Sequence, residues 1–184
     1  MDTNTHNIYL FKALDAYPYN MEETIESLNY ALSYDPNNAE ALFLMAKLYS
    51  YQLRDYETAK YYFEETMTRQ MEMSKLYPDY IYVLTLNEDY PEAQRLLDYA
   101  LKVKGTDKGL MQYLQGQLFE AILEFKSAKK ALKEAKKLSK NNDFTAFLNR
   151  EIERVKNKIP KKKNKKCKKK RSKRKEKSKH RSKK

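Results

Sequence analysis

The chain has 184 residues, with 38 Lys and Arg against 25 Asp and Glu, and a formal net charge of +13. Three Gly and five Pro are too few for an all-β fold, and a single Cys excludes both a disulfide framework and a zinc site built on paired Cys. Two His, His6 and His180, leave almost nothing for a His-based metal site or triad, and no apolar run approaches the ~18 residues of a membrane span.

One pattern recurs four times along the chain: a small residue, a large apolar residue four positions later, and a small residue three further on. The first members lie 35, 34 and 35 residues apart, and the spacings of four and three place each triplet on one helical face. The pattern predicts four helices that neighbouring helices approach closely. The triplets are Thr24, Leu28, Ala31; Ala59, Phe63, Thr66; Ala93, Leu97, Ala100; and Ala128, Leu132, Ala135.

Each of these helices is expected to follow another apolar helix, most clearly in the second repeat. Pro36 ends the helix before that repeat, and Asn37 or Asn38 can cap the next one. Asp55 precedes the second helix, which begins at Tyr56. The predicted unit is an antiparallel helix pair of about 34 residues. The first helix has its apolar positions at i, i+3, i+4 and i+7, namely Leu42, Met45, Ala46 and Tyr49.

These segments resemble the tetratricopeptide repeat family. Residues 39–49 resemble its first helix, residues 55–63 its second helix, and residues 30–39 its junction between repeats. The resemblance covers about residues 8–142. It implies an all-α fold, a right-handed α-solenoid of about four helix-turn-helix repeats, and a binding scaffold without enzymatic activity.

The sequence departs from the family pattern in several places. No Trp is present, and the loop before Asp55 is one residue longer than the pattern. Pro18 and Pro78 predict short or shifted first helices in repeats one and three. Gln112 and Gln115 stand where apolar residues are expected, so the first helix of repeat four is predicted to pack in a different register.

A last helix follows the repeats and is predicted to close the array. Asp143 can cap it, and an array must end with a helix that is apolar inward and polar outward. We therefore expect one domain over residues 1–159, made of the repeats and this capping helix. Its apolar stripe is Phe144, Phe147, Leu148, Ile152, Val155 and Ile159.

A basic tail begins at Pro160. Residues 160–184 hold 17 Lys and Arg against one acid, Glu176, for a net charge of +16. Such a segment cannot bury enough apolar surface to offset its ordering entropy, so we expect it to be disordered. Residues 1–100, by contrast, carry a net charge of −10.

The tail is predicted to bind polyanions by releasing counterions, without sequence specificity. Nucleic acid or a ribosome is favoured over a membrane surface, because the tail has no apolar stripe for insertion into lipid. The alternative is that the tail folds back on the acidic repeats. The predicted polyanion-binding residues are Lys161, Lys162, Lys163, Lys165, Lys166, Lys168, Lys169, Lys170, Arg171, Lys173, Arg174 and Lys175.

A partner is expected on the concave surface, which the first helices line in stacked helix pairs. An exposed Phe43 beside Lys47 would be a plausible anchor, because aromatic residues are enriched at interfaces. The alternative is that Phe43 and Tyr113 pack on the neighbouring repeat. The predicted protein-binding residues are Glu40, Phe43, Lys47 and Ser50 in repeat two and Tyr113, Gln117 and Glu120 in repeat four.

The 16 Tyr have two interpretations. Residues such as Tyr61, Tyr62, Tyr77, Tyr80 and Tyr82 could form a stacking platform for bases, but their spacing favours packing between helices. The acidic character of residues 1–100 also opposes binding of phosphate by this part of the chain.

The sequence contains no catalytic, cofactor-binding or metal-binding motif that we would assign. It has no glycine-rich phosphate loop, no His-Glu-x-x-His and no acidic calcium loop. Acidic pairs such as Glu22 and Glu23 are read as a solvated helical face, and an enzyme is the third choice among the functions. We predict a non-enzymatic scaffold with a protein or peptide partner, and as the alternative a factor associated with RNA, DNA or ribosomes through its tail.

The expected location is the cytoplasm, because the first residues carry no basic segment followed by an apolar one and no membrane span is present. In a nucleated cell, the same basic run is typical of a nuclear-import signal.

Overall fold

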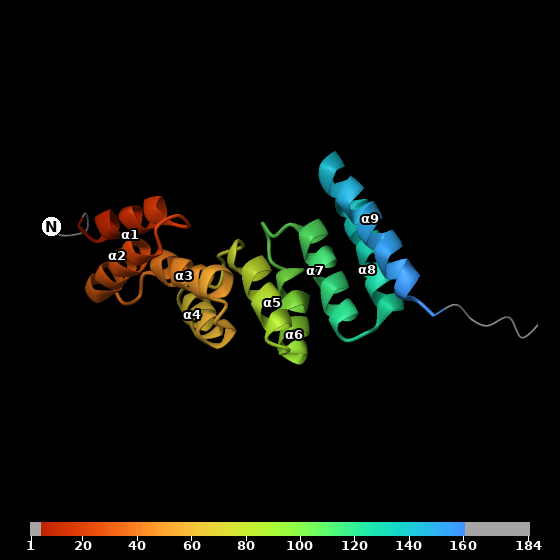
Figure 1. Ribbon diagram of the computed structural model, residues 1–184, viewed down its shortest axis with the longest axis horizontal. Coiled ribbons are helices and arrows are strands. Elements are labelled where there is room, and N and C mark those ends of the chain that lie inside the picture. The colour runs from red at the N-terminus through yellow and green to blue at the C-terminus, as the bar shows by residue number, and fades with distance from the viewer. Residues whose placement is uncertain (1–4, 161–184) are drawn as a thin grey trace, which may run out of the picture.

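The computed structural model describes residues 5–160, and every regular element in this range is a helix (Figure 1). The expected disorder of the tail concerns residues 161–184, which lie outside the described range. The elements are α1 Thr5–Ala16, α2 Met21–Tyr34, α3 Ala39–Lys47, the π-helix η1 Leu48–Leu53, α4 Tyr56–Arg69, α5 Leu76–Leu86, α6 Tyr90–Ala100, α7 Lys108–Ala121, α8 Phe125–Leu138 and α9 Asn142–Lys158.

The helices pack as four successive pairs: α1 with α2, α3 with α4, α5 with α6, and α7 with α8. Figure 1 shows the pairs side by side in one row, from the N-terminal pair to α9, which packs on α8. The predicted all-α solenoid of four helix pairs with a terminal helix is therefore confirmed.

The four triplets of small and large residues lie at the packed contacts between helices. All twelve side chains lie in the second helices of the pairs, and none is more than 2% exposed. In the fourth pair the helices approach especially closely, because a Cβ added to Gly116 would lie only 2.9 Å from Leu132. The pattern in the sequence thus marks the contact between the helices of each pair.

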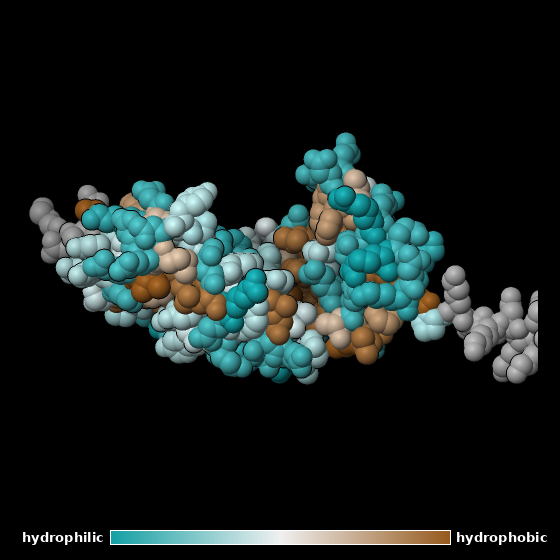
Figure 2. Space-filling model, in the orientation of Figure 1, coloured by the Kyte–Doolittle hydropathy of each residue, from teal (hydrophilic) through white to brown (hydrophobic). Residues whose placement is uncertain are grey.

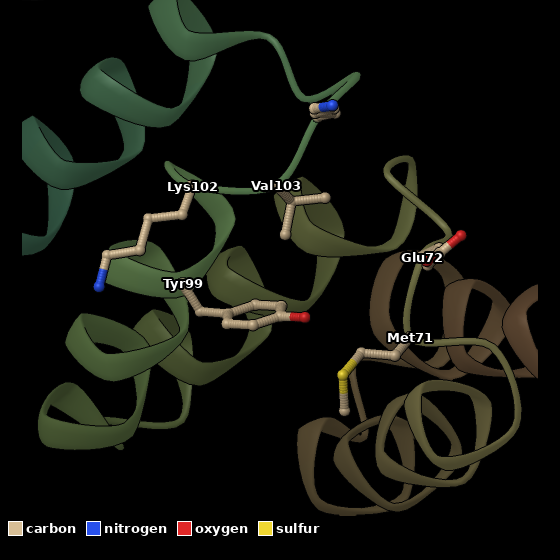
Figure 3. Close-up of a pocket in the computed structure, with 6 residues that line it drawn as sticks. Met71, Glu72, Tyr99, Lys102 and Val103 are labelled. Carbon is tan, nitrogen blue, oxygen red and sulfur yellow. The ribbon is translucent and has the colours of Figure 1, made fainter.

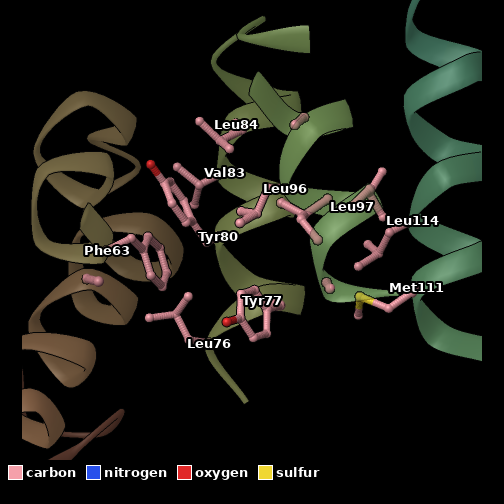
Figure 4. Packing of buried hydrophobic residues seen from close by; sticks show 14 of the residues in the cluster. Phe63, Leu76, Tyr77, Tyr80, Val83, Leu84, Leu96, Leu97, Met111 and Leu114 are labelled. Atoms are coloured by element: carbon pink, nitrogen blue, oxygen red, sulfur yellow. The ribbon is translucent and has the colours of Figure 1, made fainter. Parts of the chain in front are cut away.

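The largest hydrophobic cluster joins α3 to α7 through the middle of the array (Figure 4). Phe63 of α4 stacks on Tyr80 of α5, with 5.2 Å between ring centroids and 14° between ring planes. Tyr77 and Tyr80 are both at most 1% exposed, so the packing interpretation is correct for these two tyrosines. Two smaller clusters lie at the ends of the array.

The extra residue before Asp55 is accommodated inside the first helix of repeat two. There the chain leaves the α-helical pattern and forms η1, and Arg54 then takes a left-handed conformation with φ of 55°. A π-helical turn holds one residue more than an α-helical turn, so the helix absorbs the insertion. Asp55 can therefore still cap α4, accepting a hydrogen bond from the backbone N–H of Thr58 at 3.1 Å.

The structure shows which residues cap α3 and α9. Asn38 caps α3 by accepting from the N–H of Ala41, so Asn38 rather than Asn37 is the cap. The expectation that Asp143 caps the last helix is wrong. Asn141 accepts from the N–H groups of Asp143 and Phe144, and Asp143 lies within the first turn.

Pro78 and Pro18 have the expected effect on their neighbouring helices. Pro78 lies in the first turn of α5, which has only 11 residues against 14 in α7, and Pro18 follows the end of α1. Among the helices of residues 5–160, none combines the length and apolar character needed to cross a membrane.

Candidate functional site

Each pair has a first helix, α1, α3, α5 or α7, and Figure 1 shows α1 above α2 and α3 above α4. We call the solvent-facing side of the first helices the first-helix surface. In the space-filling view the outline is hollowed on this side, between the N-terminal helices and α9 (Figure 2). It is the surface on which the sequence predicted a partner.

Two of the predicted residues of repeat two belong to the core. Phe43 is only 7% exposed and meets Phe63 edge-on, with ring centroids 6.1 Å apart. Ser50 is 3% exposed and donates a hydrogen bond to the carbonyl of Lys47. The expectation of an exposed Phe43 anchor is therefore wrong, and the alternative, that Phe43 packs, is correct.

The other two predicted residues of repeat two surround the edge of Phe43 with charge. Glu40 forms an ion pair with Lys75, which precedes α5. The Lys75 Nζ lies 5.4 Å and the Lys47 Nζ 5.7 Å from the centroid of the Phe43 ring. Ammonium groups at this distance attract an aromatic ring by its quadrupole. Phe43 thus forms the floor of a charged strip that crosses from repeat two to repeat three.

A second group of side chains lies next to this strip, and we call it the tyrosine–aspartate cluster: Tyr17, Lys47, Tyr51, Asp79 and Tyr82. The Tyr51 hydroxyl donates to the Asp79 carboxylate at 2.7 Å. The rings of Tyr51 and Tyr82 stack, with centroids 5.9 Å apart and 12° between planes. The Lys47 Nζ lies 5.8 Å from the Tyr17 ring centroid. The cluster joins the first three repeats.

The electrostatics of this cluster are set mainly by burial. Burial raises the pKa of the Asp79 carboxyl, and the hydrogen bond from Tyr51 and the charge of Lys47 oppose this only in part. Burial, followed by the hydrogen bond to Asp79, also raises the pKa of the Tyr51 hydroxyl, which therefore remains a donor. Burial likewise raises the pKa of Tyr17. A half-buried carboxylate with further lone pairs can accept donors from another molecule.

The equivalent positions of repeat four are covered by α9. Tyr113 meets Phe144 and Phe147 of α9, with ring centroids 6.0 and 5.4 Å apart, and its hydroxyl accepts from Gln117 at 2.7 Å. Glu120 accepts from Arg154 Nη2 at 2.6 Å and from Lys158 at 2.7 Å. The expectation that this stripe faces solvent is therefore wrong, because the capping helix occupies it.

A shallow hollow of about 420 Å³ opens between the α4–α5 connection and the end of α6 (Figure 3). Its lining mixes charged residues with Met71, Val103 and Tyr99, whose ring projects between them in the close-up. A neighbouring hollow shares Met71 and Tyr99 and is lined mostly by apolar groups. The lining of neither hollow includes His or Cys, the residue types that most often act as base and nucleophile.

Within residues 5–160 no group of three or more His, Cys, Asp or Glu side chains is placed to hold a metal ion. The twelve predicted polyanion-binding residues, from Lys161 to Lys175, lie outside the described range.

Sequence reasoning missed Tyr17, Tyr51 and Asp79. The available signal was the extra residue before Asp55, since that insertion lies in the turn that carries Tyr51. Asp79 follows Pro78 in the first turn of α5, where its carboxylate is near the first-helix surface of repeat two. Recognising the pair required knowing which turns of successive repeats lie side by side.

Comparison of the sequence with family models finds no match, and comparison with curated proteins finds none either. Solved structures with a similar fold include MamA 41-end from Desulfovibrio magneticus RS-1, with TM-score 0.65 and 18% identity, covering 84% of this chain and 89% of that one. A double mutant of MamA RS-1 gives TM-score 0.66 and 14% identity, covering 84% and 96%. An O-GlcNAc transferase mutant from Thermobaculum terrenum gives 0.61 and 16%, covering 74% of this chain but 27% of that one. At these identities the similarity concerns the fold alone.

Proposed function

The chain has the tetratricopeptide-repeat fold, and on that premise we propose that it is a non-enzymatic scaffold that holds a polypeptide partner on the first-helix surface of repeats one to three. The observation that carries the proposal is the tyrosine–aspartate cluster. It joins three repeats, and the contacts of α9 are with repeat four and not with this cluster.

The cluster favours a partner segment that carries hydrogen-bond donors or a positive charge. Among the described residues, only Tyr51 donates a hydrogen bond to Asp79, so the carboxylate keeps further acceptor capacity. The stacked rings of Tyr51 and Tyr82 offer a flat surface beside it, and the exposed fraction of Tyr51 is 41%. Tyrosines of this kind supply large contact areas at interfaces.

Photo-crosslinking tests this proposal on the full chain. Benzoylphenylalanine replaces Tyr82 in one variant and Tyr61 in a control, since Tyr61 is 56% exposed on α4, a second helix. We expect position 82 to give a discrete adduct with a polypeptide that persists after nuclease treatment, and position 61 to give none. Equal adducts at the two positions would contradict the proposal.

We also propose that residues 160–184 form a polybasic segment that tethers the assembly to an anionic partner, separate from the repeat domain of residues 1–159. Its net charge of +16 supports this, and it supports equally the alternative that the tail is the main binding element of a factor associated with RNA, DNA or ribosomes. If partners are lost on nuclease treatment or on deletion of the tail, the alternative is favoured. Partners that residues 1–159 retain favour the scaffold.

A further inference from the structure

The outward face of α8 is covered by lysines. Ala128, Ala131, Leu132 and Ala135 form the buried side of this helix, which packs against α7 and α9. The helix contains six lysines against one glutamate, Glu134. The lysines of α8 and of the residues directly after it are Lys126, Lys129, Lys130, Lys133, Lys136, Lys137 and Lys140.

These lysines are arranged as a row. With about 100° of rotation per residue, Lys126, Lys130, Lys133 and Lys137 fall opposite the buried side. All four are exposed. Neighbours at spacings of three and four lie roughly 5–6 Å apart, so the row presents four ammonium groups over roughly 16 Å. We call these four residues the lysine row.

Little in the described part of the chain neutralises the row. Lys137 pairs with Glu134 at 2.7 Å, and no other lysine of α8 forms an ion pair with a residue in the range 5–160. Like charges at spacings of three and four destabilise an isolated helix by about 0.2–0.5 kcal/mol per pair. The row therefore opposes folding of α8 slightly, and the core of the repeat does not require it.

The charge on the second helices reverses along the array. The second helix of the first pair, α2, contains Glu22, Glu23 and Glu26 and no Lys or Arg, whereas α8 has a net charge of +5. A hollow of about 290 Å³ is lined both by Lys126 at the start of the row and by Pro160, where the polybasic segment begins. The segment thus starts beside one end of the row.

We propose that the lysine row of α8 binds the phosphate backbone of a nucleic acid, as a site on the folded array that extends the tether and is distinct from the protein-binding surface. A backbone of closely spaced phosphates is complementary to a straight row of exposed ammonium groups. A membrane surface is disfavoured because Leu138, the exposed apolar residue of α8, points about 100° away from the row.

The test uses the full chain and compares two variants that each lose two positive charges. Lys130→Gln with Lys133→Gln changes the row, and Lys12→Gln with Arg95→Gln changes exposed residues on α1 and α6. Fluorescence anisotropy measures binding to a labelled single-stranded RNA and to a DNA duplex between about 50 and 200 mM salt. The row variant should bind about tenfold more weakly at 100 mM, and the slope of log K against log salt for the duplex should fall by about 1.8. The control should lose less than about threefold.

Equal losses in the two variants would overturn the proposal, because only overall charge would then matter. The proposal is also wrong if the row variant loses binding to vesicles containing phosphatidylserine while keeping its affinity for both nucleic acids. A comparison of the two nucleic acids identifies which one supplies the phosphates.

Lysine acetylation of the unmodified chain gives an independent readout: RNA or DNA should protect the row more than Lys12. A variant with Lys161, Lys162, Lys163 and Lys165 changed to Gln tests the tail, so failure of the tether and failure of the row can be distinguished.

Discussion

The first-helix surface differs between repeats one to three and repeat four. In the first three repeats, Tyr51, Asp79 and Tyr82 form a cluster that α9 does not contact. In the fourth, Tyr113 and Glu120, the counterparts of Phe43 and Ser50 of repeat two, contact α9. The first-helix side of repeat four is therefore used for internal packing, because the element that follows it, α9, lies over it. Repeat arrays need such a closing helix because their last repeat cannot bury its own apolar side.

The largest effect is expected from a mutation that loosens the packing of α9 on repeat four. Leu148 of α9 is fully buried among Leu132, Ile152 and their neighbours. Leu148→Ala should lower the free energy of unfolding by about 2–5 kcal/mol, because it leaves a cavity between α8 and α9. The measurement is chemical denaturation together with hydrogen exchange, which should accelerate in α7 to α9 and leave α2 to α4 protected. The adjacent exposed residue supplies the control, since Asn149→Ala should change stability by less than about 0.5 kcal/mol. Equal losses would show that α9 does not hold repeat four.

A smaller effect is expected from the ion pairs that hold α9 over repeat four. The hydrogen bonds from Arg154 are the main reason why the pKa of Glu120 is lowered. The stabilisation is present above the unfolded pKa, near 4.3, and is lost as pH falls through the lower folded pKa. Glu120→Gln should therefore destabilise the chain by about 1 kcal/mol at pH 7, with the difference disappearing in acid. Denaturation curves measured between neutral and acidic pH check this, with Glu153→Gln as control, since Glu153 is exposed and, among the described residues, pairs only with Lys156 of its own helix. A difference that persisted unchanged in acid would contradict the ion-pair explanation.

The smallest effect on stability, with the opposite dependence on pH, is expected from Asp79 in the tyrosine–aspartate cluster. Burial raises the pKa of Asp79, so its ionised form lowers stability at neutral pH and protonation restores it as pH falls through the folded pKa. Asp79→Asn keeps an acceptor for Tyr51 and should raise stability by up to about 0.5 kcal/mol at pH 7, with no gain in acid. The same change should weaken the crosslink formed at position 82. Clear destabilisation by Asp79→Asn at pH 7 would show that the carboxylate supports the fold instead of a partner.

Much of the fold could be predicted because it depends on spacings within one chain segment. The triplets such as Ala59, Phe63 and Thr66 are buried in all four repeats, and Pro36 and Asp55 mark helix ends as expected. These features are local: a periodicity, a cap or a proline acts over a few residues. The four pairs and the terminal helix follow from them.

The candidate site could be predicted only in part, because it depends on contacts between repeats. Phe43 was expected on the surface, yet it meets Phe63 and the side chains of the next repeat, since α3 is buried over most of its length. No sequence pattern predicted that Glu120 would pair with Arg154, which lies 34 residues later. Tyr51 and Asp79 are separated by 28 residues and meet only when the pairs are stacked.

The π-helical segment η1 shows how this array accepts changes in length. An added residue there leaves Leu48 and Ser50 buried, and Asp55 still begins the next helix on the normal pattern. Tyr51 lies in this wider turn, and its hydroxyl donates a hydrogen bond to the Asp79 carboxylate of the next repeat. An insertion at the bend of a hairpin can therefore place a new side chain between repeats in a single genetic event, without any compensating substitution in the interior.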